Sequence, residues 1–126
     1  MITPDDRRYS TEHEWALEEE EVVRVGITAY AQDQLGDIVF LDIPEAGSEL
    51  EASKPCGELE SVKSVSDLYS PVSGNVVRVN QEVIEDPELA NLEPYERGWL
   101  MEIEAWDLSE LDRLLTAKGY DAFIEE

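Results

Sequence analysis

The sequence predicts a mainly β fold, a sandwich or a barrel, with few helices. Short runs rich in β-branched residues recur along the chain, and turn residues such as proline and glycine separate them. Helical spacing is confined to one short segment and to the C-terminal segment. At 126 residues the chain is the size of one domain, and it can bury a core without disulfides or a structural metal. We therefore expect residues 1–126 to form a single domain.

The first half of the chain is expected to combine strands with one helix. In chain order we expect strands at 13–17 and 21–27 joined by a solvent-facing acidic turn at 18–21, a short helix at 28–36, a buried strand at 37–44, and a loop with a brief extended segment at 45–57. Thr28 is a typical N-cap, Gly36 a typical helix end, and Pro44 stops the following strand. One face of the expected helix is shared by Tyr30, Ala31 and Leu35.

The second half is expected to contain a hairpin, two further strands and a terminal helix. In chain order we expect strands at 56–62 and 65–70, a turn at 70–75, a strand at 76–80, a long acidic stretch at 82–98 interrupted by two prolines, a strand at 99–106, and an amphipathic helix at 108–126. Val62 and Val65 are expected to anchor the hairpin strands. The terminal helix is expected to begin at the N-cap Ser109, with Asp112 three residues on and with an apolar face of Leu111, Leu114 and Leu115.

The chain is strongly acidic, with 31 Asp plus Glu against 9 Lys plus Arg and a formal net charge of −22. A negative potential of this size opposes binding to nucleic acids and to anionic membranes, so protein partners with basic faces are expected instead. It also favours a monomer. Adaptation to a salty cytoplasm explains the same composition, and the sequence alone leaves both explanations open.

We expect a cytoplasmic location. The N-terminal residues lack the apolar stretch of a signal peptide, and apolar runs such as that at 38–41 are too short to cross a bilayer. Cys56 is the only cysteine, so nothing requires an oxidising compartment. An organellar protein whose targeting segment has been removed stays open.

Few side chains are suited to catalysis or to metal binding. One histidine and one cysteine do not supply the usual zinc ligands, and neither a calcium loop nor a glycine-rich phosphate loop is present. The single histidine, His13, lies beside Trp15 and is expected to be structural. We therefore expect no metal and no enzyme.

Lys63 stands out because the chain has only two other lysines, Lys54 and Lys118. It falls at the tip of the expected hairpin. A lysine amine is protonated near neutral pH and is a weak nucleophile, so another enzyme would have to activate it. An acyl group attached there would form a long neutral arm with its own chemistry. Local features alone favour an ordinary solvated lysine.

The order of the motifs reverses that preference. Over almost the whole chain the sequence resembles the glycine cleavage system H-protein family, and the motifs that carry this resemblance are TEHEW, VGITAYAQDQLGDIVFLDIPEAG, ESVKSVSDLYSPVSG, VN, PYERGWL and SELDRLL. The resemblance implies a lipoyl/biotinyl-type β sandwich, or barrel-sandwich hybrid, with an N-terminal elaboration, short helices and a C-terminal helix.

The resemblance also implies a function. The lysine of the ESVK motif, Lys63 here, would carry covalent lipoate added by a lipoate-attaching enzyme. The arm would accept an aminomethyl group from glycine at the P protein, glycine decarboxylase, and present it to the T protein, an aminomethyltransferase. The L protein, dihydrolipoyl dehydrogenase, would then reoxidise it. In this family the H protein is a carrier and not a catalyst.

Three acidic residues match the family's cleft by position. Glu14 and Asp67 fall where relatives have acidic residues that can attract a protonated amine, and Glu12 stands where some relatives have serine. The resemblance therefore implies a cleft for the loaded arm formed by Glu12, Glu14 and Asp67.

Four alternatives remain open at this point. A biotin carrier typically has methionines beside its lysine, where this chain has Val62 and Ser64. The lipoyl domain of a 2-oxoacid dehydrogenase usually has Asp before the lysine and a flexible linker, and neither is present. The other two are an H-like protein that relays lipoate to other complexes and an unmodified acidic interaction module.

Overall fold

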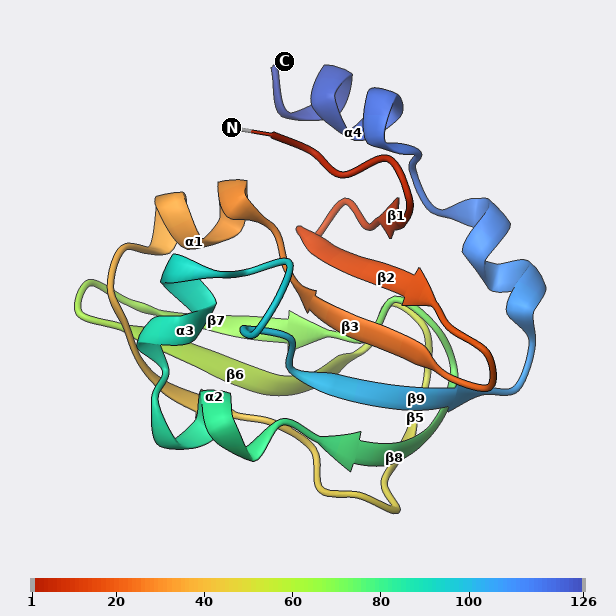
Figure 1. The fold of residues 1–126 in the computed structure, drawn as a ribbon, viewed down its shortest axis with the longest axis horizontal. Helices are drawn as coiled ribbons and strands as arrows, with labels where there is room; N and C mark the ends of the chain where they lie inside the picture. The colour runs from red at the N-terminus through yellow and green to blue at the C-terminus, as the bar shows by residue number, and fades with distance from the viewer. Residues whose placement is uncertain (1, 126) are drawn as a thin grey trace.

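The computed structural model describes residues 2–125, which form two antiparallel sheets with short helices at their edges (Figure 1). The strands are β1 (Arg8–Tyr9), β2 (Glu14–Glu18), β3 (Val23–Ile27), β4 (Ile38–Asp42), β5 (Glu49–Leu50), β6 (Pro55–Ser61), β7 (Val65–Tyr69), β8 (Gly74–Val79) and β9 (Met101–Ala105). The helices are α1 (Ala29–Leu35), α2 (Gln81–Glu85), α3 (Glu88–Leu92), the 3-10 helix η1 (Leu108–Arg113) and α4 (Ala117–Ile124). The mainly β sandwich predicted from the sequence is confirmed, without closure into a barrel.

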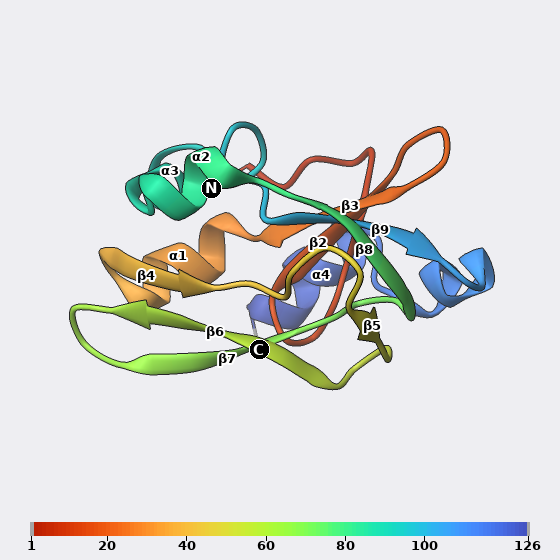
Figure 2. The ribbon, with the colours of Figure 1, turned by 90° about the horizontal axis from the view of Figure 1, so that it is seen from below.

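The two sheets differ in size and share one apolar core. The larger sheet has the strand order β1-β2-β3-β9-β8-β5, and the smaller has the order β4-β6-β7. Figure 2 shows β4, β6 and β7 below the larger sheet, with the β6–β7 loop reaching the edge of the molecule. Val25 and Ile103 of the larger sheet belong to the same buried cluster as Leu59 and Leu68 of the smaller one. The core therefore fixes the β6–β7 hairpin against the rest of the protein.

A second, aromatic cluster joins the two ends of the chain. It consists of buried Tyr9, Trp15, Trp99 and Tyr120, with the Tyr9 and Tyr120 rings stacked at 4.9 Å between centroids. The indole of Trp15 crosses Gly26 of the neighbouring strand so closely that a Cβ at position 26 would lie 2.5 Å from it. The cluster therefore attaches α4 to β1 and β2. Figure 1 shows α4 at the top of the molecule, above β1 and β2.

Strand β4 is predicted to be buried, but two of its apolar side chains are exposed. Val39 is 50% exposed and Phe40 55% exposed, while Ile38 and Leu41 are buried. A β-bulge between Ile38 and Phe40 breaks the alternation of the strand against β6, so two successive apolar side chains reach the surface. The continuous apolar run could not reveal this, because a bulge depends on pairing.

The predicted single C-terminal helix is wrong. The chain forms η1, an extended link at Leu114 to Thr116, and then α4 with Thr116 as its N-cap. Asp107, and not Ser109, caps η1, because its side chain accepts a hydrogen bond from the Ser109 amide. In the link, Leu115 bonds through its backbone to Tyr9, which replaces helical hydrogen bonds.

The acidic stretch at 82–98 also differs from expectation, because two short helices, α2 and α3, lie in it. Asn80 caps α2, and Pro87 stands at the start of α3, where a missing amide hydrogen does no harm. Within residues 2–125 no helix has the length and apolar character that crossing a membrane requires.

Gly26→Ala is expected to destabilise the fold by about 1–3 kcal/mol, because the added methyl group must displace the buried Trp15 ring. Urea unfolding followed by far-UV circular dichroism measures this. Gly119→Ala is the matched control, since a Cβ there has its nearest contact at 3.4 Å and a helical alanine is favourable. Equal free energies of unfolding for the two variants would show that Trp15 does not pack closely against Gly26.

Candidate functional site: the lysine turn and its cavity

Lys63 lies exposed in the connection between β6 and β7. We call residues 61–64, from the last residue of β6 to the residue before β7, the lysine turn. The turn is fixed by Ser61, which is buried although its neighbours are exposed. The Ser61 hydroxyl accepts hydrogen bonds from the Lys63 amide at 3.2 Å and from the Ser64 amide at 3.1 Å. The Ser61 amide donates to the Ser64 carbonyl at 2.8 Å. The backbone at Lys63 is therefore held in place while its side chain stays accessible.

Val62 and Val65 do not anchor the hairpin, contrary to the prediction. Val62 is 66% exposed and Val65 is 59% exposed. The anchor is polar instead, because the Ser61 hydroxyl satisfies backbone groups that the turn leaves unpaired. The hairpin itself, with Lys63 at its tip, is as predicted.

A cavity of about 240 Å³ opens beside the hairpin, and we call it the hairpin cavity. Its lining residues are Glu12, His13, Glu14, Ile27, Tyr30, Ala31, Gln34, Leu35, Leu59, Ser66 and Asp67. Helix α1 forms one wall, and β6 and β7 form another. The acidic lining residues are Glu12 of the loop before β2, Glu14 at the start of β2 and Asp67 of β7. Thr28 caps α1 by accepting from the Ala31 amide at 3.1 Å. The cavity therefore combines apolar side chains of α1 and β6 with carboxylates from two distant segments.

The loop that carries Glu12 and Glu14 is held by Ser10. The Ser10 hydroxyl donates to Glu14 Oε1 at 2.7 Å and accepts from the Glu14 amide at 3.1 Å. The same hydroxyl also accepts from the Glu12 amide at 3.3 Å. His13 completes the tight loop with a φ of 72°. The three acidic residues matched by position thus line one cavity, although they come from two distant segments.

Glu14 is the unusual member of the group because it is buried, with 2% of its surface exposed. Burial raises the pKa of its carboxyl from the usual 4.5 to about 8, since a charge in an apolar setting loses its hydration. The hydrogen bonds from the Ser10 hydroxyl and the Tyr69 amide oppose this rise. At neutral pH the cavity therefore holds a mostly protonated carboxyl.

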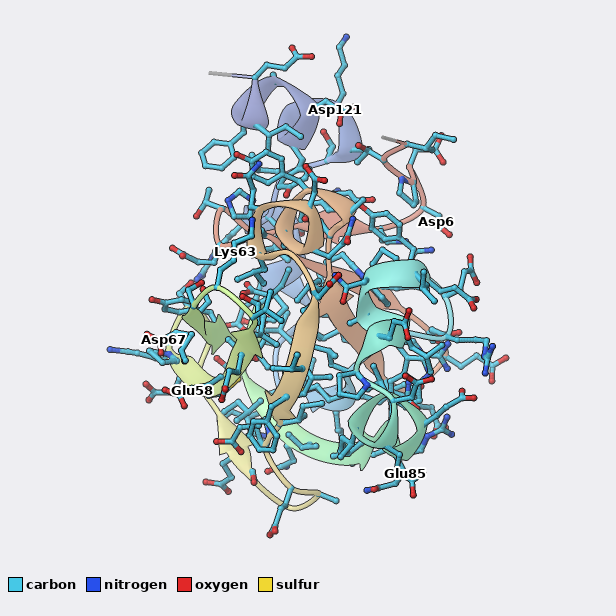
Figure 3. The ribbon with its side chains drawn as sticks, turned by 90° about the vertical axis from the view of Figure 1, so that its left-hand side faces the viewer. Asp6, Glu58, Lys63, Asp67, Glu85 and Asp121 are labelled. Carbon is cyan, nitrogen blue, oxygen red and sulfur yellow. The ribbon has the colours of Figure 1, made fainter. Side chains whose placement is uncertain are left out.

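Glu12 and Asp67 are exposed at the rim of the cavity. Asp67 stands directly opposite Glu58 across the β6–β7 pair, and Figure 3 shows the two side chains close together beneath Lys63. Like charges opposite each other in a sheet cost stability. The rim is therefore acidic at some expense to the fold.

His13 has a structural environment. Its Nδ1 lies 2.8 Å from the Tyr120 hydroxyl, which in turn lies 2.8 Å from the buried Thr28 hydroxyl. Burial lowers the pKa of the His13 imidazole. His13 therefore links α4 to the cavity wall, in keeping with the structural role expected from its place beside Trp15.

Cys56 is a half-buried residue of β6, as expected for a small strand residue. Burial raises the pKa of its thiol to about 12, with a further contribution from the Glu14 charge. A thiol of that kind is protonated and unreactive at neutral pH. No cluster of three or more possible metal-binding side chains occurs in the described part of the chain, residues 2–125.

Several residues of the site have no recognisable signal in the sequence. Ser10 and Ser61 organise the site, yet small hydroxyl residues in loops are common and carry no distinctive local signal. The face shared by Tyr30, Ala31 and Leu35 was predicted, and all three line the cavity. Leu59 and Ser66 stand opposite each other across the hairpin, so strand alternation could have indicated them once the register was known.

Comparisons with known proteins give a consistent result. A family model described as Glycine cleavage H-protein matches residues 7–126. The chain is 52% identical over 126 residues to the glycine cleavage system H protein of Geobacillus sp. (strain WCH70), covering 100% of this chain and 99% of that protein. It is 48% identical to the H protein of Bacillus subtilis (strain 168) over the same length.

The chain belongs to the glycine cleavage H-protein family. A crystal structure of the H protein from Mycobacterium marinum is also similar, with a TM-score of 0.90 and 40% identity over 98% of this chain and 99% of that one. The full-length matches assign to the chain the family's role as lipoate carrier of the glycine cleavage system. The resemblance stated from the sequence motifs is confirmed.

Glu14→Gln is expected to change the pH dependence of stability. The pKa of Glu14 in the folded protein, about 8, lies above the usual 4.5. The contribution of Glu14 to the free energy of unfolding is therefore fully present below pH 4.5, and it is lost as the pH rises through 8. The variant should therefore gain stability over the original protein between pH 5 and pH 8, by roughly 2–4 kcal/mol at about 1.4 kcal/mol per pKa unit.

Urea unfolding at a series of pH values measures this difference. Glu12→Gln is the control, because the side chain of Glu12 is exposed to solvent and not buried like that of Glu14. If the difference in free energy of unfolding between Glu14→Gln and the original protein did not change with pH, Glu14 would be ionised in the folded protein at neutral pH.

Proposed function

We propose that Lys63 is the residue that carries lipoate, and that the hairpin cavity shelters the loaded arm between visits to partner enzymes. The observation that carries the proposal is the combination of an exposed lysine on a fixed turn with a cavity beside the same hairpin. Lipoate supplies a dithiolane that accepts the aminomethyl group and is later reoxidised. The single domain spans residues 1–126 in this proposal, and it acts as a monomer.

The chain is suited to such an arm in two ways. Lys63 is exposed and lies clear of the core, so a lipoate-attaching enzyme has access to its Nζ. The cavity has apolar walls from Ile27, Leu35 and Leu59, which match the hydrocarbon part of the arm. Its volume of about 240 Å³ takes part of a chain of this length, with the remainder at the open side.

Glu14 provides the polar end of the cavity. A cationic amine that enters beside it favours the ionised carboxyl, so the pKa of Glu14 falls and one proton leaves to solvent. The exposed carboxylates of Glu12 and Asp67 at the rim attract the same cation. Water has limited access to an amine held there, which slows the loss of ammonia.

In this proposal the chain catalyses no step itself. Its partners are the P, T and L proteins and a lipoate-attaching enzyme. The only histidine is bonded to Tyr120, and the only cysteine is a half-buried thiol, so the side chains most often used as base and nucleophile are both committed to structure. The net charge of −22 favours encounters with basic surfaces on those partners.

Intact-mass measurement of protein made in lipoate-replete cells tests the attachment site. We expect a mass increase of one lipoyl group, absent from Lys63→Arg and retained in Lys118→Arg, since Lys118 lies on α4. An unmodified chain would favour the acidic interaction module. The lipoylated protein should then support exchange between glycine and bicarbonate with the cognate P protein, and failure to do so would favour lipoate relay.

Glu14→Ala should leave lipoylation unchanged and speed ammonia loss from the loaded carrier several-fold, because the cavity loses its buried carboxyl. Asp67→Ala should have a smaller effect of the same sign. Ammonia release from isolated loaded protein is the measurement. Glu58→Ala is the matched control, because Glu58 faces Asp67 but does not line the cavity. The same release rate in all three variants would exclude shelter by these carboxylates.

A further inference from the structure

We propose that Gly36 and Asn91 are positioning residues that hold the stem of Lys63 at the mouth of the hairpin cavity. They belong to what we call the ledge, residues 36–38 together with Asn91 of α3. The inference rests on the proposed function, because positioning matters for transfer only if Lys63 carries the arm.

The stem of Lys63 lies directly over Gly36. A Cβ at position 36 would be 2.9 Å from Lys63 Cε, 3.5 Å from Nζ and 3.8 Å from Cδ. Gly36 has a φ of +80°, in the left-handed region that favours glycine. The glycine therefore ends α1 and also leaves room for the lysine. Any other residue would occupy the space that the stem now fills.

The ledge is bonded to the lysine turn. The Val62 amide donates to the Asp37 carbonyl at 3.0 Å, so the residue before Lys63 is attached to the residue after Gly36. Together with the hydrogen bonds of Ser61, this contact fixes the backbone from Ser61 to Ser64. The stem and its support therefore belong to one hydrogen-bonded unit.

Asn91 of α3 also holds the ledge, through the hydrogen bonds of its side-chain amide. Its Nδ2 donates to the Gly36 carbonyl at 2.9 Å and to Gln32 Oε1 at 3.2 Å, and its Oδ1 accepts from the Ile38 amide at 2.9 Å. The two N–H donors and the oxygen acceptor of the Asn91 side chain are therefore all hydrogen-bonded, to α1 and to the residues that follow it. Such a bridge holds the backbone on both sides of Asp37.

The position of the ledge sets the direction of the arm. Gly36 follows Leu35, and both Leu35 and Gln34 line the hairpin cavity. A stem that rests on Gly36 therefore places Nζ at the C-terminal end of α1, next in sequence to the α1 residues that line the cavity. Since modification occurs at Nζ, the arm begins there, and less conformational freedom is lost when it enters. The ledge thus favours the sheltered arm over the extended one.

Nuclear magnetic resonance of the unmodified protein tests the ledge without any cofactor. Lysine labelled with ¹³C and ¹⁵N gives only three sets of side-chain signals, from Lys54, Lys63 and Lys118. We expect a nuclear Overhauser effect between the Lys63 Hε and Gly36 Hα protons, and slower Cε motion for Lys63 than for Lys54 and Lys118. Absence of that effect, or equal motion at all three lysines, would overturn the inference.

Variants of the lipoylated protein test its consequence. Gly36→Ala should speed ammonia loss from the loaded carrier at least threefold, with lipoylation unchanged. Gly47→Ala is the matched control, because Gly47 also has a positive φ, 97°, but a Cβ there meets nothing within 4 Å. Equal rates in these two variants would overturn the inference.

Asn91→Asp is a second variant in case Gly36→Ala does not fold. Aspartate keeps the acceptor for the Ile38 amide and loses the donor to the Gly36 carbonyl, so faster Lys63 Cε motion and faster ammonia loss are expected. Unchanged motion would overturn the inference. If the original protein carries no lipoate, the proposed function fails, while the Overhauser measurement still decides whether the ledge exists.

Discussion

The structure depends on the hydrogen bonds that Ser61 makes inside the lysine turn. Lys63 is exposed and has a long side chain, so its backbone must be held for the chain to present that side chain at a fixed place. The buried Ser61 hydroxyl accepts from the amides of Lys63 and Ser64 and closes the turn without apolar contacts. Val62 and Val65 are consequently free to face solvent. A fixed backbone beneath an accessible side chain is what a carrier of a covalent arm requires.

The cavity beside that turn combines features that oppose stability. Glu14 is buried as a carboxyl with a raised pKa, and Asp67 stands opposite the like charge of Glu58. Both arrangements cost stability by themselves, and a nearby cation offsets that cost. The two-sheet core and the aromatic cluster supply the stability that offsets them. This pattern is common where binding sites are built on rigid scaffolds.

Sequence patterns predicted the elements that depend on local chemistry. The β6–β7 hairpin, the N-cap Thr28 and the acidic turn at 18–21 follow from strand propensity, capping and charge repulsion. Patterns failed where pairing or tertiary contact decides the outcome. The bulge that exposes Phe40 needs its partner strand, and the extended link before α4 forms because Leu115 bonds to Tyr9. Asn91 lies far in sequence from the residues that it bridges, so no local signal indicates its role.

Glu12, Glu14 and Asp67 were named from the family resemblance and not from spacing, and the fold brings them to one cavity. The central claim is that this cavity holds the loaded arm. The most direct measurement uses lipoylated protein loaded with a ¹³C-labelled aminomethyl group and records Overhauser effects from the labelled carbon's protons. The account predicts contacts with methyl groups of Leu35 or Leu59, which line the cavity. A label with no protein contacts, tumbling freely like a group in solvent, would contradict it.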